Sequence, residues 1–129
     1  METTMTPADR ELLELAAKAF WADDEVSIRF DENEDGLIYT HADNQDHNGQ
    51  DFERVWNPRD DDGDCARLEA ALLIDVEWTY PRGRVYCSPP LKSSVPRVTE
   101  NAADHNNDLQ AARRMASLRA AAEVGRAMP

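Results

Sequence analysis

Residues 56–73, near the middle of the chain, read WNPRDDDGDCARLEAALL, a polar turn followed by a helical segment. The Asn57-Pro58 pair favours the turn, because asparagine hydrogen-bonds its own backbone and proline fixes φ. A helix is predicted from Asp62 to Leu73, and the aspartates at its start suit the positive end of the helix dipole. Its apolar face carries Cys65, Leu68 and Leu72.

Toward the N-terminus the sequence predicts a helix followed by a β-hairpin. Thr6 and Pro7 mark a helix start, and the helix is expected to end near Ala22. Alternating residues predict a strand over Val26–Phe30, and Gly36–Thr40 has the composition of its hairpin partner. The apolar face of the helix, by its spacing, consists of Leu12, Leu15, Ala16, Ala19 and Phe20.

Toward the C-terminus the sequence predicts a second hairpin and a third helix. The two strands are expected at 76–80 and 84–87, and the helix at 108–126. Two polar stretches separate the elements: 41–51 is predicted to be an exposed loop and 88–107 an irregular connection. The inner stripe of the last helix is predicted to be Ala111, Met115, Leu118 and Ala122.

The element order α-ββ-α-ββ-α predicts an α+β fold, a small mostly antiparallel sheet of about four strands covered by three helices. The length of 129 residues favours one domain over 1–129. The sequence contains no apolar run as long as a transmembrane helix and no secretory signal pattern after Met1. We therefore expect a cytoplasmic protein without a membrane partner.

The chain is acidic, and its acidic residues are unevenly distributed. The net charge of −12 and the isoelectric point of about 4.5 exclude a generally basic nucleic-acid-binding protein. Met1–Asp64 contains 19 acidic and 5 basic residues, whereas Cys65–Pro129 contains 7 and 9. Direct binding of nucleic acid by the arginines of the last helix is therefore not expected. The oppositely charged halves are compatible with either a monomer or a dimer.

Three segments occur in one order along the chain: LLELAAKA at 12–19, WNPRDDDGDCARL at 56–68, and AARRM through RAAAEVGR at 111–126. Together they resemble a family of small phage and prophage proteins, the phage α/β/α (ABA) sandwich domain. The resemblance implies a viral origin and a sandwich-like fold with helices on both faces of a sheet, and it implies no activity. The chain departs from the family pattern in its polar insert, 40–51, and in Cys65, where alanine is expected.

The sequence carries no local signature of catalysis or of a cofactor. It lacks GxSxG, HExxH and a glycine-rich phosphate loop, so we expect a protein that is not an enzyme and uses no cofactor. Cys65 and Cys87 have no CxxC spacing, and each falls on an apolar face. We interpret them as small buried hydrophobic residues.

Two acidic segments have the residue types that bind divalent cations. Asp31–Gly36 matches the first half of a calcium loop, with Asp31, Asn33 and Asp35 as ligands, but Ala42 replaces its last carboxylate. A hairpin turn explains the same residues. The Asp60–Asp64 block is compatible with a cation as well as with helix capping. Binding of a divalent cation or small ligand at either segment is the alternative function.

The first hypothesis is a phage-encoded accessory protein that binds a host or phage protein, as an inhibitor or as a mimic of nucleic acid. Its acidic surface would steer a basic partner over a long range. A surface that only keeps the protein soluble explains the same charges. The predicted contact residues are Asp23, Asp24, Glu25, Glu32, Glu34 and Asp35, together with Asp60, Asp61, Asp62 and Asp64.

Overall fold

The computed structural model of the protein describes residues 6–22, 26–30, 36–41, 53–79, 83–89 and 95–128. In chain order the elements are α1 (Pro7–Trp21), β1 (Val26–Phe30), β2 (Leu37–His41), β3 (Arg54–Trp56), α2 (Asp62–Leu72), β4 (Asp75–Thr79), β5 (Arg84–Ser88), β6 (Val98–Asn101), the 3₁₀ helix η1 (Ala102–His105) and α3 (Leu109–Ala127). The predicted α+β class and its three helices are confirmed. Of the loop predicted at 41–51, His41 ends β2 and the rest lies outside the described residues.

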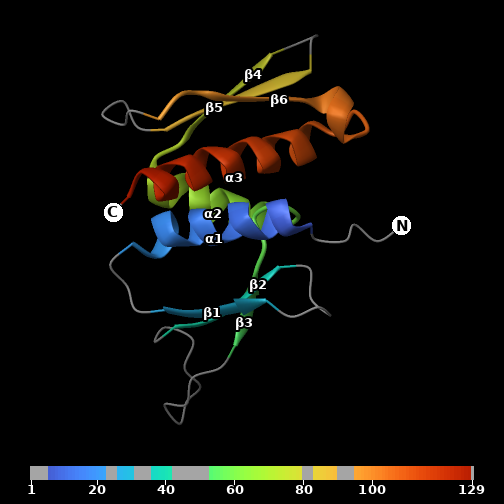
Figure 1. The fold of residues 1–129 in the computed structure, drawn as a ribbon. Helices are drawn as coiled ribbons and strands as arrows, with labels where there is room; N and C mark the ends of the chain where they lie inside the picture. Colours follow the sequence, from blue (N-terminus) through green and yellow to red (C-terminus); the bar gives the residue numbers. More distant parts are fainter. Residues whose placement is uncertain are drawn as a thin grey trace.

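The helices form a layer between two small antiparallel sheets (Figure 1). One sheet has the strand order β1-β2-β3 and the other β4-β5-β6. Polar residues alternate with apolar ones along β1 and β4, so each sheet has one apolar face to bury. The strands are thus grouped differently from the predicted single sheet of about four. Each sheet contacts helices on one face, whereas the family resemblance implies helices on both.

Helix α1 begins and ends as predicted, but it buries a partly different set of side chains. Thr6 Oγ1 accepts a hydrogen bond from the Asp9 amide at 3.1 Å, and Asp9 Oδ2 accepts one from the Thr6 amide at 3.2 Å. This capping box satisfies two backbone donors at the helix start. Leu13, Ala16, Ala17, Ala19 and Trp21 are buried, whereas Leu12, Leu15 and Phe20 are half-buried. The shift arises because α1 packs against α3 as well as against a sheet.

The sheet β1-β2-β3 contributes an aromatic cluster to the core. Leu37 and Trp56 are paired on neighbouring strands and are almost completely buried. The Trp56 ring lies 5.0 Å from that of Trp21, and Trp21 lies 4.8 Å from Tyr39. Such ring contacts add to the gain from burying aromatic surface. The sheet is thereby fixed to the C-terminal end of α1.

Two strands, β3 and β6, were not predicted. The expectation of an irregular connection over 88–107 is wrong at Ser88, which ends β5, and at 98–105, where β6 and η1 lie. Val98 is the only apolar residue of β6, so its sequence has no alternation to reveal a strand. Pairing with β5, which places Val98 opposite Cys87, completes the sheet instead. The short β3 is likewise formed by pairing with β2.

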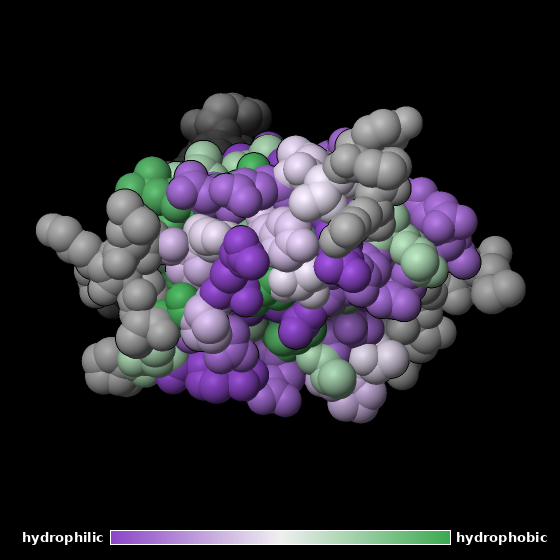
Figure 2. Space-filling model, turned by 90° about the horizontal axis from the view of Figure 1, so that it is seen from above, coloured by the Kyte–Doolittle hydropathy of each residue, from purple (hydrophilic) through white to green (hydrophobic). Residues whose placement is uncertain are grey.

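The outer face of the sheet β4-β5-β6 is mostly hydrophilic (Figure 2). Arg97, just before β6, lies over the ring of Tyr86 in the central strand at 4.3 Å, a cation–π contact. The opposite face is apolar, and its Val85 and Cys87 are completely buried. Helix α3 covers that inner face over β5 and β6.

Helix α3 is buried on more sides than a single stripe predicts. Its buried residues are Ala112, Ala116, Ser117, Leu118, Ala120, Ala121, Ala122 and Gly125, while the predicted Ala111 and Met115 are half-buried. The helix lies between the sheet β4-β5-β6 and the other two helices (Figure 1). Small residues are needed there because both neighbours approach its backbone closely. The alanine-rich composition thus reflects a central position.

Candidate functional site

The turn before α2 is held by Asn57. Its side-chain oxygen accepts hydrogen bonds from the amides of Arg59 at 3.1 Å and Asp60 at 3.3 Å, and its Nδ2 donates to Asp60 Oδ2 at 2.9 Å. Its own amide donates to Asp64 Oδ2 at 2.9 Å, and Pro58 is buried behind the turn. The predicted Asn-Pro turn is therefore a rigid one, with most of its polar groups engaged.

Arg59 lies at the centre of this turn, and its side chain is only 7% exposed. It donates to Asp9 Oδ2 at 3.0 Å and from Nε and Nη2 to Asp60 at 3.1 and 2.6 Å. Burial alone would lower the pKa of Arg59, but the hydrogen bonds and charges of Asp60 and Asp9 raise it overall. Its carbonyl oxygen accepts from Arg114 Nε at 2.8 Å. Arg59 thus ties the turn to α1 and α3.

The other aspartates of the block also have partners within the chain. Asp61 caps α2 by accepting from the Asp64 amide at 2.7 Å. Asp62 pairs with Arg114 at 2.7 Å, and Asp64 with Arg67 at 2.6 Å. The side chains of Asp61 and Asp62 nevertheless remain 59% and 60% exposed. The block is a structural junction that still presents two carboxylates to solvent.

These contacts lie where the N-terminal ends of the three helices come together. Helices α1, α2 and α3 run in the same direction through their layer (Figure 1). Their positive dipole ends therefore meet, which favours carboxylates at this place. Asp9, Asp61 and Asp108 each accept hydrogen bonds from backbone amides at a helix start. These three aspartates therefore have a structural role at the helix starts, which explains part of the negative charge of the chain.

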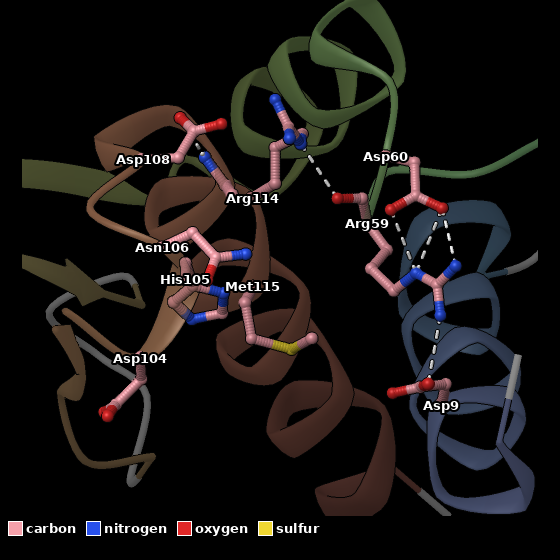
Figure 3. Close-up of a pocket in the computed structure, with 10 residues that line it drawn as sticks. Asp9, Arg59, Asp60, Asp104, His105, Asn106, Asp108, Arg114 and Met115 are labelled. Carbon is pink, nitrogen blue, oxygen red and sulfur yellow. Dashed lines mark hydrogen bonds and ion pairs between the residues drawn. The ribbon is translucent and has the colours of Figure 1, made fainter. Parts of the chain in front are cut away.

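A pocket of about 560 Å³ lies at this end of the molecule (Figure 3). Four parts of the chain line it: Asp9 from α1, Arg59 and Asp60 from the turn, Asp104, His105 and Asn106 from η1 and the residue after it, and Asp108, Ala111, Arg114 and Met115 from the N-terminal part of α3. Pockets of this volume are typical of small-ligand sites. The tertiary structure therefore brings part of the predicted acidic block to the wall of a pocket.

The charges of the pocket wall are four carboxylates and two guanidinium groups. Both guanidinium groups are engaged with the protein, since Arg59 binds Asp9 and Asp60, and Arg114 binds Asp62 and a backbone carbonyl. On the other wall, His105 Nε2 lies 2.8 Å from a carboxylate oxygen of Glu100. With four carboxylates against two guanidinium groups, the lining carries an excess of negative charge.

A second group of polar side chains is buried among α2, α3 and β5. Glu69 accepts from Arg113 at 2.5 and 2.9 Å and from the Ser117 hydroxyl at 2.6 Å. Burial alone would raise the pKa of Glu69, but the hydrogen bonds from Arg113 and Ser117 lower it. Cys65 lies 3.5 Å from this carboxylate, and Cys87 lies 3.2 Å from the serine. The network joins all three elements.

Both thiols are completely buried. Burial, the largest cause, raises the pKa of Cys65 to about 12 and that of Cys87 to about 11. A thiol that keeps its proton is a poor nucleophile and a poor metal ligand. The interpretation of both residues as buried hydrophobic side chains is therefore in accord with their environment.

Six of the ten predicted contact residues lie outside the described residues: Asp23, Asp24, Glu25, Glu32, Glu34 and Asp35. The calcium-loop candidates Asp31, Asn33 and Asp35 lie outside them as well. Asp60, Asp61, Asp62 and Asp64 lie together at the turn. Within the described ranges, no group of three or more His, Cys, Asp or Glu side chains is placed to hold a metal ion.

Sequence reasoning missed the pocket and five residues on its wall: Arg59, Asp104, His105, Asn106 and Arg114. No motif links these residues, because they come from the turn, η1 and α3. The helix starts at Thr6, Asp61 and Asp108 can be recognised in the sequence. The sequence does not show that these three helix starts lie next to one another. A pattern along one segment carries no information about which helix ends are neighbours.

No protein-family model matches the chain, and the comparisons with curated proteins and with solved structures give no match. The fold and the site define an α+β domain whose three helix starts surround an acidic pocket. The resemblance to the phage sandwich family stays a prediction. None of the helices in the described part of the chain is long and apolar enough to cross a membrane.

Proposed function

We propose that the protein is a phage- or prophage-encoded accessory protein that binds a basic protein of the host or of the phage, in the bacterial cytoplasm and without catalysis. The observation that carries the proposal is the exposure of Asp61 and Asp62 on a rigid turn. Arg59 and Asn57 fix the backbone beneath these carboxylates. A preorganised acidic surface loses little conformational entropy when a partner binds.

Electrostatic attraction gives this proposal a measurable signature. Exposed charges interact over a Debye length of about 10 Å at 0.1 M salt and about 3 Å at 1 M. Binding that depends on the carboxylates should therefore be tight at low salt and weak at high salt. Binding that is insensitive to salt would instead indicate an apolar contact.

The first prediction concerns the double variant Asp61→Asn/Asp62→Asn. Asparagine keeps the N-cap of α2 at position 61 and offers Arg114 an amide oxygen at position 62, so the variant removes two charges at the cost of one ion pair. With the protein immobilised, a basic protein should be retained from a bacterial lysate at low salt and released at 1 M. The variant should retain it about fivefold more weakly, because each exposed charge contributes about 0.5 kcal/mol.

The matched control is Glu14→Gln/Glu77→Gln, which removes the same charge from exposed positions on α1 and β4. It should retain the basic protein almost as well as the unchanged chain. Equal weakening by both double variants would mean that net charge alone causes retention. That result, or the capture of nothing specific, would contradict the proposal.

A second candidate function is the binding of a small ligand or divalent cation, and the pocket of about 560 Å³ favours it. A ligand that binds the folded state alone stabilises it by about 2.7 kcal/mol at one hundred times its dissociation constant. Under this function, calcium, magnesium, manganese or zinc should raise the melting temperature in a thermal scan. No shift with any of the four ions would remove the cation form of this function.

A further inference from the structure

The pocket at the helix starts has an apolar surface between two polar walls. In Figure 3, Met115 extends from α3 into the space between His105 on one side and Arg59 and Asp9 on the other. Ala111 lines the same side of the pocket one turn earlier on α3. Apolar surface of this kind suits methylene groups and gives a fully hydrated ion no advantage.

The cationic groups of the wall are turned toward the protein. The side chains of Arg59 and Arg114 are only 7% and 15% exposed. Arg59 donates from all three nitrogens of its guanidinium group to Asp9 and Asp60. An anionic ligand would have to compete with these carboxylates for the same donors, which makes anion binding unfavourable here.

Asp9 and Asp108 each have one carboxylate oxygen that accepts no hydrogen bond within the described part of the chain. Both hydrogen bonds to the Asp9 carboxylate within the described residues end on Oδ2. The other oxygen, Oδ1, lies on the pocket side (Figure 3). Asp104 and Asp108 are exposed at the rim. Asp108 caps α3 through Oδ1. The pocket thus combines carboxylate oxygens with an apolar surface.

We infer that this pocket receives a cationic side chain, lysine or arginine, from the basic partner. The inference rests on the proposed function and assigns its anchoring contact. The methylene stem packs on Met115 and Ala111, and the charged head pairs with the carboxylates in a charge-assisted hydrogen bond. A volume of about 560 Å³ holds one such side chain together with adjoining backbone.

Three small probes test the pocket directly: N-acetyl-arginine amide, N-acetyl-lysine amide and N-acetyl-citrulline amide. Citrulline has nearly the shape of arginine without its charge. We expect the two cationic probes to shift the methyl resonance of Met115 and the amide resonance of Asn106 in a saturable way. The citrulline probe should leave both resonances unchanged.

The double variant Asp104→Asn/Asp108→Asn removes two rim charges, and asparagine still caps α3. It should weaken binding of the cationic probes about fivefold. The control Asp75→Asn/Glu77→Gln makes the same change on the exposed residues of β4 and should leave the probe affinity unchanged. Asp9 is left unchanged in this variant, because its carboxylate also accepts a hydrogen bond from Arg59.

The results of these experiments distinguish a wrong assignment of the pocket from a wrong proposed function. Absence of saturable shifts with both cationic probes, equal shifts with citrulline, or equal weakening by the control would overturn the assignment of the pocket. A basic protein that is still captured, and that Asp61→Asn/Asp62→Asn retains about fivefold more weakly, would then uphold the function alone. Probe binding without capture of a basic protein would uphold the pocket and contradict the function.

Discussion

Replacing Gly125 with alanine should lower the free energy of unfolding by about 3 kcal/mol. A Cβ atom at this position would lie 1.9 Å from the carbonyl oxygen of Leu15 and 2.8 Å from its carbonyl carbon. These are backbone atoms of α1, which cannot rotate away as a side chain can. Helices α1 and α3 would have to separate, and both contribute to the core. Urea denaturation followed by circular dichroism measures the change.

The control for this variant is Gly63→Ala in the first turn of α2. A Cβ atom there meets side-chain ends of Asp61 and Arg67 at 3.2 Å or more, and these exposed ends can move. The backbone is helical, so alanine should leave stability unchanged or raise it by up to about 1 kcal/mol. A Gly125→Ala protein within 1 kcal/mol of the unchanged chain would show that the two helices are not closely packed.

The second large effect is expected for Glu69→Leu. This change leaves the Arg113 guanidinium group, whose side chain is 17% exposed, and the fully buried Ser117 hydroxyl without their carboxylate partner. Breaking a buried ion pair on one side costs about 3 kcal/mol or more. Adding Arg113→Leu should recover part of the loss, because an ion pair replaced by apolar residues leaves no unpaired charge. Urea denaturation of Glu69→Leu, of Arg113→Leu and of the double variant completes a mutant cycle.

The contribution of the Glu69–Arg113 ion pair to the free energy of unfolding depends on pH, and the lowered pKa of Glu69 gives the direction of that dependence. The pKa of Glu69 is lower in the folded protein than its usual 4.5, so its carboxylate stabilises the fold above that pH. This contribution is lost as the pH falls through the lowered pKa. The unchanged protein should therefore lose stability below about pH 4.5 more steeply than Glu69→Leu does. Parallel curves for the two proteins, or a double variant no more stable than the single one, would contradict the proposed role of the pair.

Local patterns predicted the helices well. Pro7, Asp62 and Asp108 mark starts that agree with the structure within one residue, because capping depends on residues close in sequence. The strands predicted at Val26–Phe30 and Arg84–Cys87 agree with β1 and β5 within one residue, since alternation is a local signal. The strands β3 and β6 were not, because their pairing partners rather than their own residues define them.

The candidate site was predicted only in part. The Asp60–Asp64 block and its capping role follow from the residues themselves, and the structure adds the partners of each carboxylate. Arg59 has no local signal, since its importance comes from Asp9, fifty residues away. Burial of the two cysteines follows from apolar spacing. Their connection through Ser117 and Glu69 requires three elements to meet.

The sequence by itself determined the α+β class, the three helices and the turn before the second helix, because these depend on residues within a few positions of one another. The tertiary structure decided that the strands form two sheets around a helical layer, since long-range pairing and burial select the neighbours of each element. It also decided that three helix starts meet. That meeting places Asp9, Arg59, Arg114 and Met115 around one pocket, a set that spans more than one hundred positions in the chain.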